Sequence, residues 1–184
     1  WKDLSDVREL VEDPELSIKL DRWILVESCK QLHNFITQYP EAKLIVNLNK
    51  EILFYDQTFP EFIAKLITII GSKLSHPLIL QFSEQDITQN IPEAQKHIAQ
   101  LRQFGAEVAL RDFGNTIYSE AALRQLDVNS LTLHPALTEM LNNEQSTEAL
   151  QEKIVVLHEI KPVEIMLRGL NDMTLFANAW NVDA

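Results

Sequence analysis

The chain has 184 residues, 46% of them hydrophobic, so it can bury one sizeable core, and its length favours a single domain. Its 16 basic and 27 acidic residues give a net charge of −11, which repels phosphate backbones and anionic lipid and argues against nucleic-acid polymers as partners. No apolar run reaches the ~20 residues of a membrane-spanning helix, and no signal-peptide pattern opens the sequence. We therefore expect no membrane insertion and a cytoplasmic location.

The predicted elements alternate between helices and short buried strands. A long helix is expected to begin at Asp13-Pro14 and to end near Tyr39-Pro40. Apolar residues at helical spacing also run up to Gly105 and up to Pro162, and each of these residues is expected to end a helix. Five apolar runs are typical of buried strands: Leu44–Val46, Leu78–Leu80, Val108–Leu110, Leu131–Leu133 and Val163–Met166.

This alternation predicts βα units and a parallel sheet. It fits both a closed (β/α)₈ barrel and an open doubly wound sheet. No glycine-rich phosphate loop follows any strand, and the chain has only four glycines, so the nucleotide-binding form of the open sheet is disfavoured. The sequence therefore predicts an α/β fold whose reactive groups follow the carboxyl ends of the strands.

Polar side chains follow each predicted strand. In chain order they are Asn47, Gln81 with Glu84, Arg111 with Asp112, Thr132 with His134, and Arg168 with Asn171. His134 could ligate a metal, but no His or Cys accompanies it at ligand spacing, so a hydrogen-bonded loop histidine is the favoured interpretation.

Several of these strand ends resemble those of the bacterial EAL domain, a phosphodiesterase fold that hydrolyses cyclic di-GMP. Ala109–Gly114 is similar to the family segment with two adjacent Asp before Phe-Gly, and Leu78–Glu84 is similar to the segment ending Glu-x-Thr-Glu. Ile45–Asn49 resembles Val-Asn-Val-Ser, Leu126–His134 resembles the segment ending Leu-Lys-Ile-Asp, and Met166–Asn171 resembles Ala-Glu-Gly-Val-Glu. Order and spacing match over most of the chain.

The resemblance implies a (β/α)₈, TIM-barrel-like fold whose first and last strands this chain does not cover. The namesake Glu-Ala-Leu motif belongs on an early strand, and Glu148–Leu150 spells the tripeptide on a predicted late helix, which we treat as coincidence. The chain begins at Trp1 and not at an initiator Met. We therefore expect residues 1–184 to be a single degenerate EAL-type domain, incomplete at both ends and part of a longer multidomain signalling protein.

The implied chemistry is two-metal hydrolysis of a phosphodiester, which needs hard anionic oxygen ligands. Asn47, Glu84 and Asp112 keep oxygen donors, whereas Gln81 lacks the expected charge and Arg111 reverses it. A unit charge ~4 Å away is worth roughly 4 kcal/mol at an effective dielectric near 20, so an arginine beside a divalent ion costs about twice that. The family's lysine, catalytic Glu and second Glu are replaced in turn by Thr132, Arg168 and Asn171.

Two interpretations of Arg111 and Arg168 are open. They could be ordinary strand-end residues paired with nearby acids, or their guanidinium groups could replace the metal charges and hold Glu84, Asp112 or a ligand phosphate. In the second case the ligand site is a former active site with these residues: Asn47, Gln81, Glu84, Arg111, Asp112, Thr132, Arg168 and Asn171.

We therefore expect a domain of the degenerate, FimX-type subgroup that is not an enzyme and holds no Mg²⁺ or Mn²⁺. It would act in cyclic di-GMP signalling as a scaffold or regulator of a partner. The resemblance suggests a PilZ-type adaptor or a type IV pilus assembly component, in the control of twitching motility, and it allows a homodimer. A metal-independent cyclic di-GMP receptor is the alternative, and an active phosphodiesterase is a remote one.

Overall fold

The computed structural model describes residues 13–166, except residues 75, 115 and 143. The chain divides into two compact units, which we describe in turn. Unit 1 runs to Phe82 and includes Lys96–Glu107, and unit 2 comprises Ser83–Gln95 and the chain from Val108 onward. Among the described residues, no helix has the length and apolar character needed to cross a membrane.

The first described helix, α2 (Pro14–Phe35), begins where the sequence predicts. The Asp13 side chain accepts a hydrogen bond from the Glu15 N–H at 3.0 Å, and Pro14 takes the first helical turn, where its missing N–H costs nothing. The helix ends earlier than expected, because the Thr37 hydroxyl donates to the Asn34 carbonyl and competes with the helical ladder.

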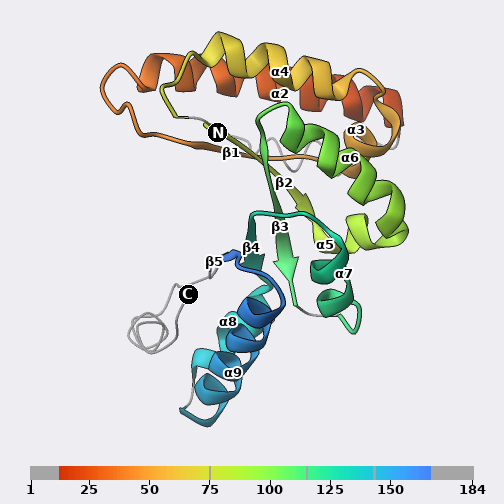
Figure 1. The fold of residues 1–184 in the computed structure, drawn as a ribbon, viewed down its shortest axis with the longest axis vertical. Helices are drawn as coiled ribbons and strands as arrows, with labels where there is room; N and C mark the ends of the chain where they lie inside the picture. The colour runs from red at the N-terminus through yellow and green to blue at the C-terminus, as the bar shows by residue number, and fades with distance from the viewer. Residues whose placement is uncertain (1–12, 75, 115, 143, 167–184) are drawn as a thin grey trace. The chain divides into compact units, whose positions relative to one another are not determined.

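The other elements of unit 1 form a parallel strand pair and its helices. Residues Leu44–Asn47 pair with Leu78–Gln81, so that Asn47 lies opposite Gln81. Helices α2 and α4 lie side by side in Figure 1. The bounds are β1 Leu44–Asn47, α3 Lys50–Tyr55, α4 Phe59–Ile70 and β2 Leu78–Ser83, followed by α6 Ile91–Gln103, whose second part belongs to this unit.

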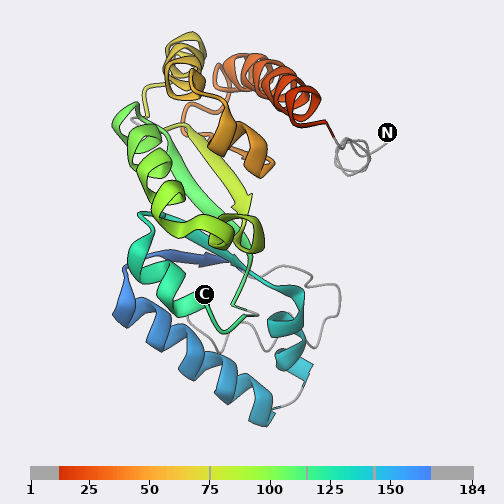
Figure 2. The ribbon, with the colours of Figure 1, turned by 90° about the vertical axis from the view of Figure 1, so that its right-hand side faces the viewer.

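Unit 2 contains three parallel strands in chain order. Ala109 pairs with Ser130 and Leu131 with Ile165, so β4 lies between β3 and β5. Helix α9 runs beside α7, as Figure 2 shows. The bounds are α5 Glu84–Ile87, η1 Thr88–Asn90, β3 Glu107–Phe113, α7 Ser119–Gln125, β4 Ser130–Leu133, α8 Pro135–Thr138, η2 Glu139–Asn142, α9 Glu144–Ile160 and β5 Glu164–Met166.

The strand and helix predictions are confirmed where the structure describes them. All five apolar runs form strands, and each pair described above is parallel. Gly105 follows α6 with φ 99°, a left-handed conformation that suits glycine at a helix end. Cys29 is buried on α2, and burial raises the pKa of its thiol to about 11.

An arginine clasp joins α2 to the connection between α3 and α4. The Arg22 Nε donates to Asp56 Oδ2 at 2.7 Å, and Nη2 donates to Asp56 Oδ1 at 2.9 Å and to Thr58 Oγ1 at 2.7 Å. The guanidinium also lies 4.5 Å from the centre of the Phe62 ring. Because the geometry is bidentate and Asp56 is only 10% exposed, we expect this pair to stabilise the fold more than an exposed ion pair does.

Replacing Arg22 by alanine should lower the free energy of unfolding by about 2 kcal/mol, because two charge-assisted hydrogen bonds and a ring contact are lost. Urea titration followed by circular dichroism measures the change. Lys30→Ala is the matched control, since Lys30 pairs with Glu27 in an exposed contact at 3.3 Å and its loss should cost less than about 0.5 kcal/mol. Equal effects of the two changes would contradict the clasp.

Candidate functional site

Two neutral amides occupy the strand ends of unit 1. The Gln81 Nε2 donates to Asn47 Oδ1 at 2.8 Å, across the register that places these two residues opposite each other. Gln81 is 7% exposed, whereas Asn47 is exposed. The amide oxygen of Asn47 is therefore already engaged by a side chain that carries no charge.

In unit 2, a bulge at the end of β3 presents Arg111 and Asp112. The register to β4 shifts between Leu110 and Phe113, and Asp112 has φ 54°, a left-handed conformation that is rare for a residue with a side chain. The Arg111 Nη1 lies 3.5 Å from Asp112 Oδ2. The Arg111 Nε is buried and has no hydrogen-bond partner in the described part of the chain, so the guanidinium has a donor to spare.

Glu84 is the most buried candidate residue, with 1% of its surface exposed. Its Oε2 accepts a hydrogen bond from the Gly114 N–H at 3.3 Å, while the buried Oε1 has no partner of good geometry among the described residues. Burial raises the pKa of Glu84. The Ser119 hydroxyl, the Gly114 N–H and the positive charge of Lys153 oppose this rise.

Thr132 and His134 lie at the end of β4. Thr132 is buried in the strand, and His134 caps α8, because its Nδ1 accepts a hydrogen bond from the Ala136 N–H at 3.1 Å. The His134 N–H donates in turn to the Phe113 carbonyl at 2.9 Å. The prediction of a hydrogen-bonded loop histidine is confirmed. The hydrogen bond from the Ala136 N–H occupies the Nδ1 lone pair that a metal would need.

The remaining predicted site residues, Arg168 and Asn171, lie outside the described residues. Of the acids expected to hold an arginine, Asp112 contacts Arg111. Glu84 has Lys153 as its nearby cation instead.

Sequence reasoning missed Lys153, although a signal was present. This lysine interrupts the apolar face of α9 that contains Leu150, Ile154 and Leu157. Its Nζ donates to the Gly114 carbonyl at 2.8 Å. A lone lysine at core spacing on a helix is a reason to look for a buried acceptor.

The oxygen ligands among the described residues do not fit the pair of divalent ions that the resemblance implies. Arg111 places a cation beside Asp112, and the Asn47 oxygen is used by Gln81. Within the described residues, no group of three or more His, Cys, Asp or Glu side chains is arranged to hold a metal ion. These residues therefore do not make up the donor set of a two-metal centre.

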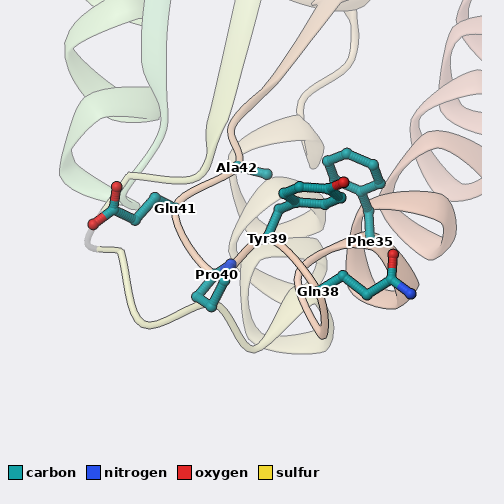
Figure 3. A pocket seen from close by; sticks show the side chains of 6 residues that line it. All are labelled: Phe35, Gln38, Tyr39, Pro40, Glu41 and Ala42. Carbon is teal, nitrogen blue, oxygen red and sulfur yellow. The ribbon is translucent and has the colours of Figure 1, made fainter.

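A separate hollow of about 580 Å³ lies on unit 1 before β1 (Figure 3). Phe35 and Tyr39 line it and stack on each other with ring centres 4.6 Å apart, and both are more than half exposed. Ala42, which precedes β1, lies on its rim, so the hollow is at the opposite end of this strand from Asn47. Sites of βα folds lie at the carboxyl ends of strands, and we assign this hollow no ligand.

Two curated relatives of this chain are named as cyclic di-GMP phosphodiesterases. The cyclic di-GMP phosphodiesterase PdeR of Escherichia coli K12 is 21% identical over 165 residues, which cover 90% of this chain and 25% of PdeR. The cyclic di-GMP phosphodiesterase PdeA of Borreliella burgdorferi is 19% identical over 163 residues, covering 88% of this chain and 24% of PdeA. The chain thus spans about a quarter of the length of these curated relatives.

The two phosphodiesterase relatives correct our expectation about enzymatic activity. We expected a protein that is not an enzyme, and this expectation is wrong, because relatives that match nearly the whole chain are named as phosphodiesterases. The inference rested on departures from the family pattern at five positions: Gln81, Arg111, Thr132, Arg168 and Asn171. Asn47, Glu84 and Asp112 keep oxygen donors, so these replacements did not establish inactivity.

The fold prediction is confirmed by solved structures. The EAL domain of FimX from Pseudomonas aeruginosa, bound to cyclic di-GMP, matches with a TM-score of 0.81 at 24% identity, covering 92% of this chain and 67% of that chain. The α/β fold with a parallel sheet is thus that of the TIM-barrel-like EAL structures. The family model for the EAL domain matches residues 3–182. With its fold and nearly its whole length matched, the chain belongs to the EAL domain family.

Proposed function

We propose that this chain is the cyclic di-GMP-recognising domain of a bacterial signalling protein. The observation that carries the proposal is the Arg111 guanidinium, which is part-buried at the carboxyl end of β3 with an unsatisfied Nε donor. A guanidinium binds a phosphate group through parallel hydrogen bonds, and the ligand has two phosphates. The crystal structure of the FimX EAL domain bound to cyclic di-GMP supports the same ligand.

The net charge of the chain makes a local cation necessary. A dianionic ligand is repelled by a protein of net charge −11, so a cation at the site has to offset this field. Arg111 supplies one in unit 2, and Arg168 is proposed as a second. Within unit 2, the proposed polar contacts are Glu84, Asp112, Thr132 and Asn171.

Independence from divalent metal is part of the proposal. The arginine charge takes the place that a metal ion would have beside Asp112. Binding therefore needs no Mg²⁺ or Mn²⁺.

Hydrolysis of the phosphodiester is a second candidate function, and Glu84 favours it. A buried carboxyl with a raised pKa can hold a proton nearer neutral pH than an ordinary Glu, as general acids and bases do. The names of PdeR and PdeA support the same reaction.

In either case we propose that the domain regulates a protein partner. The FimX-type resemblance supports a PilZ-type adaptor or a type IV pilus component, in control of twitching motility, and it allows a homodimer. Pull-down of such a partner with the wild-type chain, with and without cyclic di-GMP, tests this part.

Calorimetry should show that cyclic di-GMP binds the chain with the same affinity in EDTA and in excess Mg²⁺. Arg111→Gln should weaken binding at least tenfold, about 1.4 kcal/mol, because the phosphate loses its charged donor. Arg124→Gln, which removes an exposed arginine from α7, is the control and should bind as the wild type does. A tenfold gain in affinity on adding Mg²⁺ would contradict metal independence.

Hydrolysis is measured by chromatography of cyclic di-GMP incubated with the chain, with Mn²⁺ and with EDTA. If Glu84 supplies the proton, Glu84→Gln should lose at least 99% of product formation, a factor of about 10² that is typical of a lost acid–base group. Intact nucleotide after incubation with the wild-type chain would remove this second candidate and leave the binding proposal in place.

Glu84 should also lower the stability of the folded protein as the pH rises, which is the reverse of the usual effect of a carboxyl group. Its pKa in the folded state lies above the ordinary value of 4.5. The ionised group therefore lowers the free energy of unfolding at any pH above the raised pKa, and this loss disappears as the pH falls toward about 4.5. Glu84→Gln should therefore melt at a higher temperature than the wild type at pH 7.5, with the gap closing toward pH 4.5. Glu120→Gln, on an exposed carboxyl of α7, should show no such gap. A constant gap at all pH values would refute the assignment.

A further inference from the structure

Gly114 is held from both sides of its backbone. Its N–H donates to Glu84 Oε2 at 3.3 Å, and its carbonyl accepts from Lys153 Nζ at 2.8 Å. These two bonds connect the residue after β3 to α5 and to α9 within unit 2. We call this arrangement the Gly114 clasp.

Packing fixes the same residue sterically. Gly114 has φ 97°, and a Cβ added to it would lie 2.7 Å from Leu137 Cδ1 and 3.8 Å from Lys153 Cε. The positive φ favours glycine, and a Cβ would require the end of the Leu137 side chain to move. Lys153 Cε would be at an ordinary van der Waals distance, so Lys153 acts on Gly114 through its hydrogen bond to the carbonyl.

The bulge immediately before the clasp is strained. Asp112 adopts φ 54°, and the register to β4 shifts between Leu110 and Phe113. Such a conformation persists only where the surrounding structure holds it. The hydrogen bond from the His134 N–H to the Phe113 carbonyl holds one side of the bulge, and the Gly114 clasp holds its carboxyl-terminal side.

Lys153 has an unusual position for a lysine. It lies on the face of α9 that buries Leu150, Ile154 and Leu157, where it is only partly exposed. Ordering a lysine on an apolar face costs conformational entropy and desolvation, which a charge-assisted bond to a buried carbonyl offsets. The bond to Gly114 gives that position a physical reason.

We propose that Lys153 is a positioning residue for cyclic di-GMP binding. Through the Gly114 clasp it fixes the bulge of β3, and the bulge sets the positions of Arg111 and Asp112. The inference rests on the proposed function, since the ligand is the one proposed above. Lys153 itself touches neither Arg111 nor Asp112 in any contact that the structure gives. Its effect passes through the backbone of Phe113 and Gly114.

The test compares Lys153→Met, which keeps the length of the side chain, with Lys153→Arg, which keeps the charge. Lys161→Met is the matched control, because Lys161 Nζ also donates to a backbone carbonyl of unit 2, that of Leu126. Calorimetry with cyclic di-GMP gives the affinity, and amide exchange by NMR gives the protection of the Gly114 N–H. The Asn129 N–H, which bonds to the Val108 carbonyl at 2.8 Å, is the reference amide.

Lys153→Met should weaken binding at least tenfold and speed exchange at Gly114 at least tenfold, with exchange at Asn129 unchanged. Lys153→Arg should restore both values to within threefold of the wild type. Lys161→Met should leave the affinity unchanged even where it lowers the melting temperature. If Lys153→Met fails to fold, Lys153→Gln takes its place with the same expected values.

Wild-type affinity in the Lys153→Met protein would overturn the inference, whether or not exchange at Gly114 changes. Weakened binding with unchanged exchange at Gly114 would overturn it too, because the effect would then not pass through the clasp. Absence of binding by the wild-type chain would refute the proposed function instead, and exchange at Gly114 would still decide whether Lys153 holds the bulge.

Discussion

Burial of one carboxyl group, that of Glu84, sets the conditions for the end of β3. A carboxylate removed from water has to be surrounded by donors and positive charge, or it takes up a proton. Unit 2 supplies these groups from Ser119 of α7 and Lys153 of α9, together with the Gly114 backbone. The segment after β3 is thereby drawn to a defined place, and the bulge that carries Arg111 and Asp112 is defined with it.

The candidate residues of the two units differ in how they treat charge. In unit 1 the two candidate residues, Asn47 and Gln81, are neutral amides joined by a hydrogen bond. In unit 2 Arg111 brings its own positive charge to Asp112 and keeps a donor free. This distribution is the basis of our proposal of a phosphate ligand. Chemistry that needs only a proton, as at Glu84, stays compatible with it.

Periodicity predicted much of the fold, because buried strands and helix ends leave local signals. The five apolar runs, the start at Asp13-Pro14 and the end at Gly105 are of this kind. Helix α4 carries a local signal too, since its buried Phe59, Ile63, Leu66 and Ile70 recur at helical spacing. The left-handed Asp112 and the clasp at Gly114 could not be predicted, since both depend on side chains far along the chain, such as Leu137 and Lys153. The strand-end residues could be found because each follows an apolar run, and the wrong expectation about enzymatic activity came from their departures from the family pattern.

The buried Cys29 has a practical consequence for following the molecule in solution. Thiol reagents attack the thiolate, and a thiol with a pKa of about 11 inside the core of unit 1 offers almost none at neutral pH. Modification of native Cys29 therefore has to wait for the packing around α2 to open, so its rate measures how often that opening occurs. A cysteine introduced on the surface would react far sooner, and the chain accepts a spectroscopic label at a chosen position without removal of its own thiol.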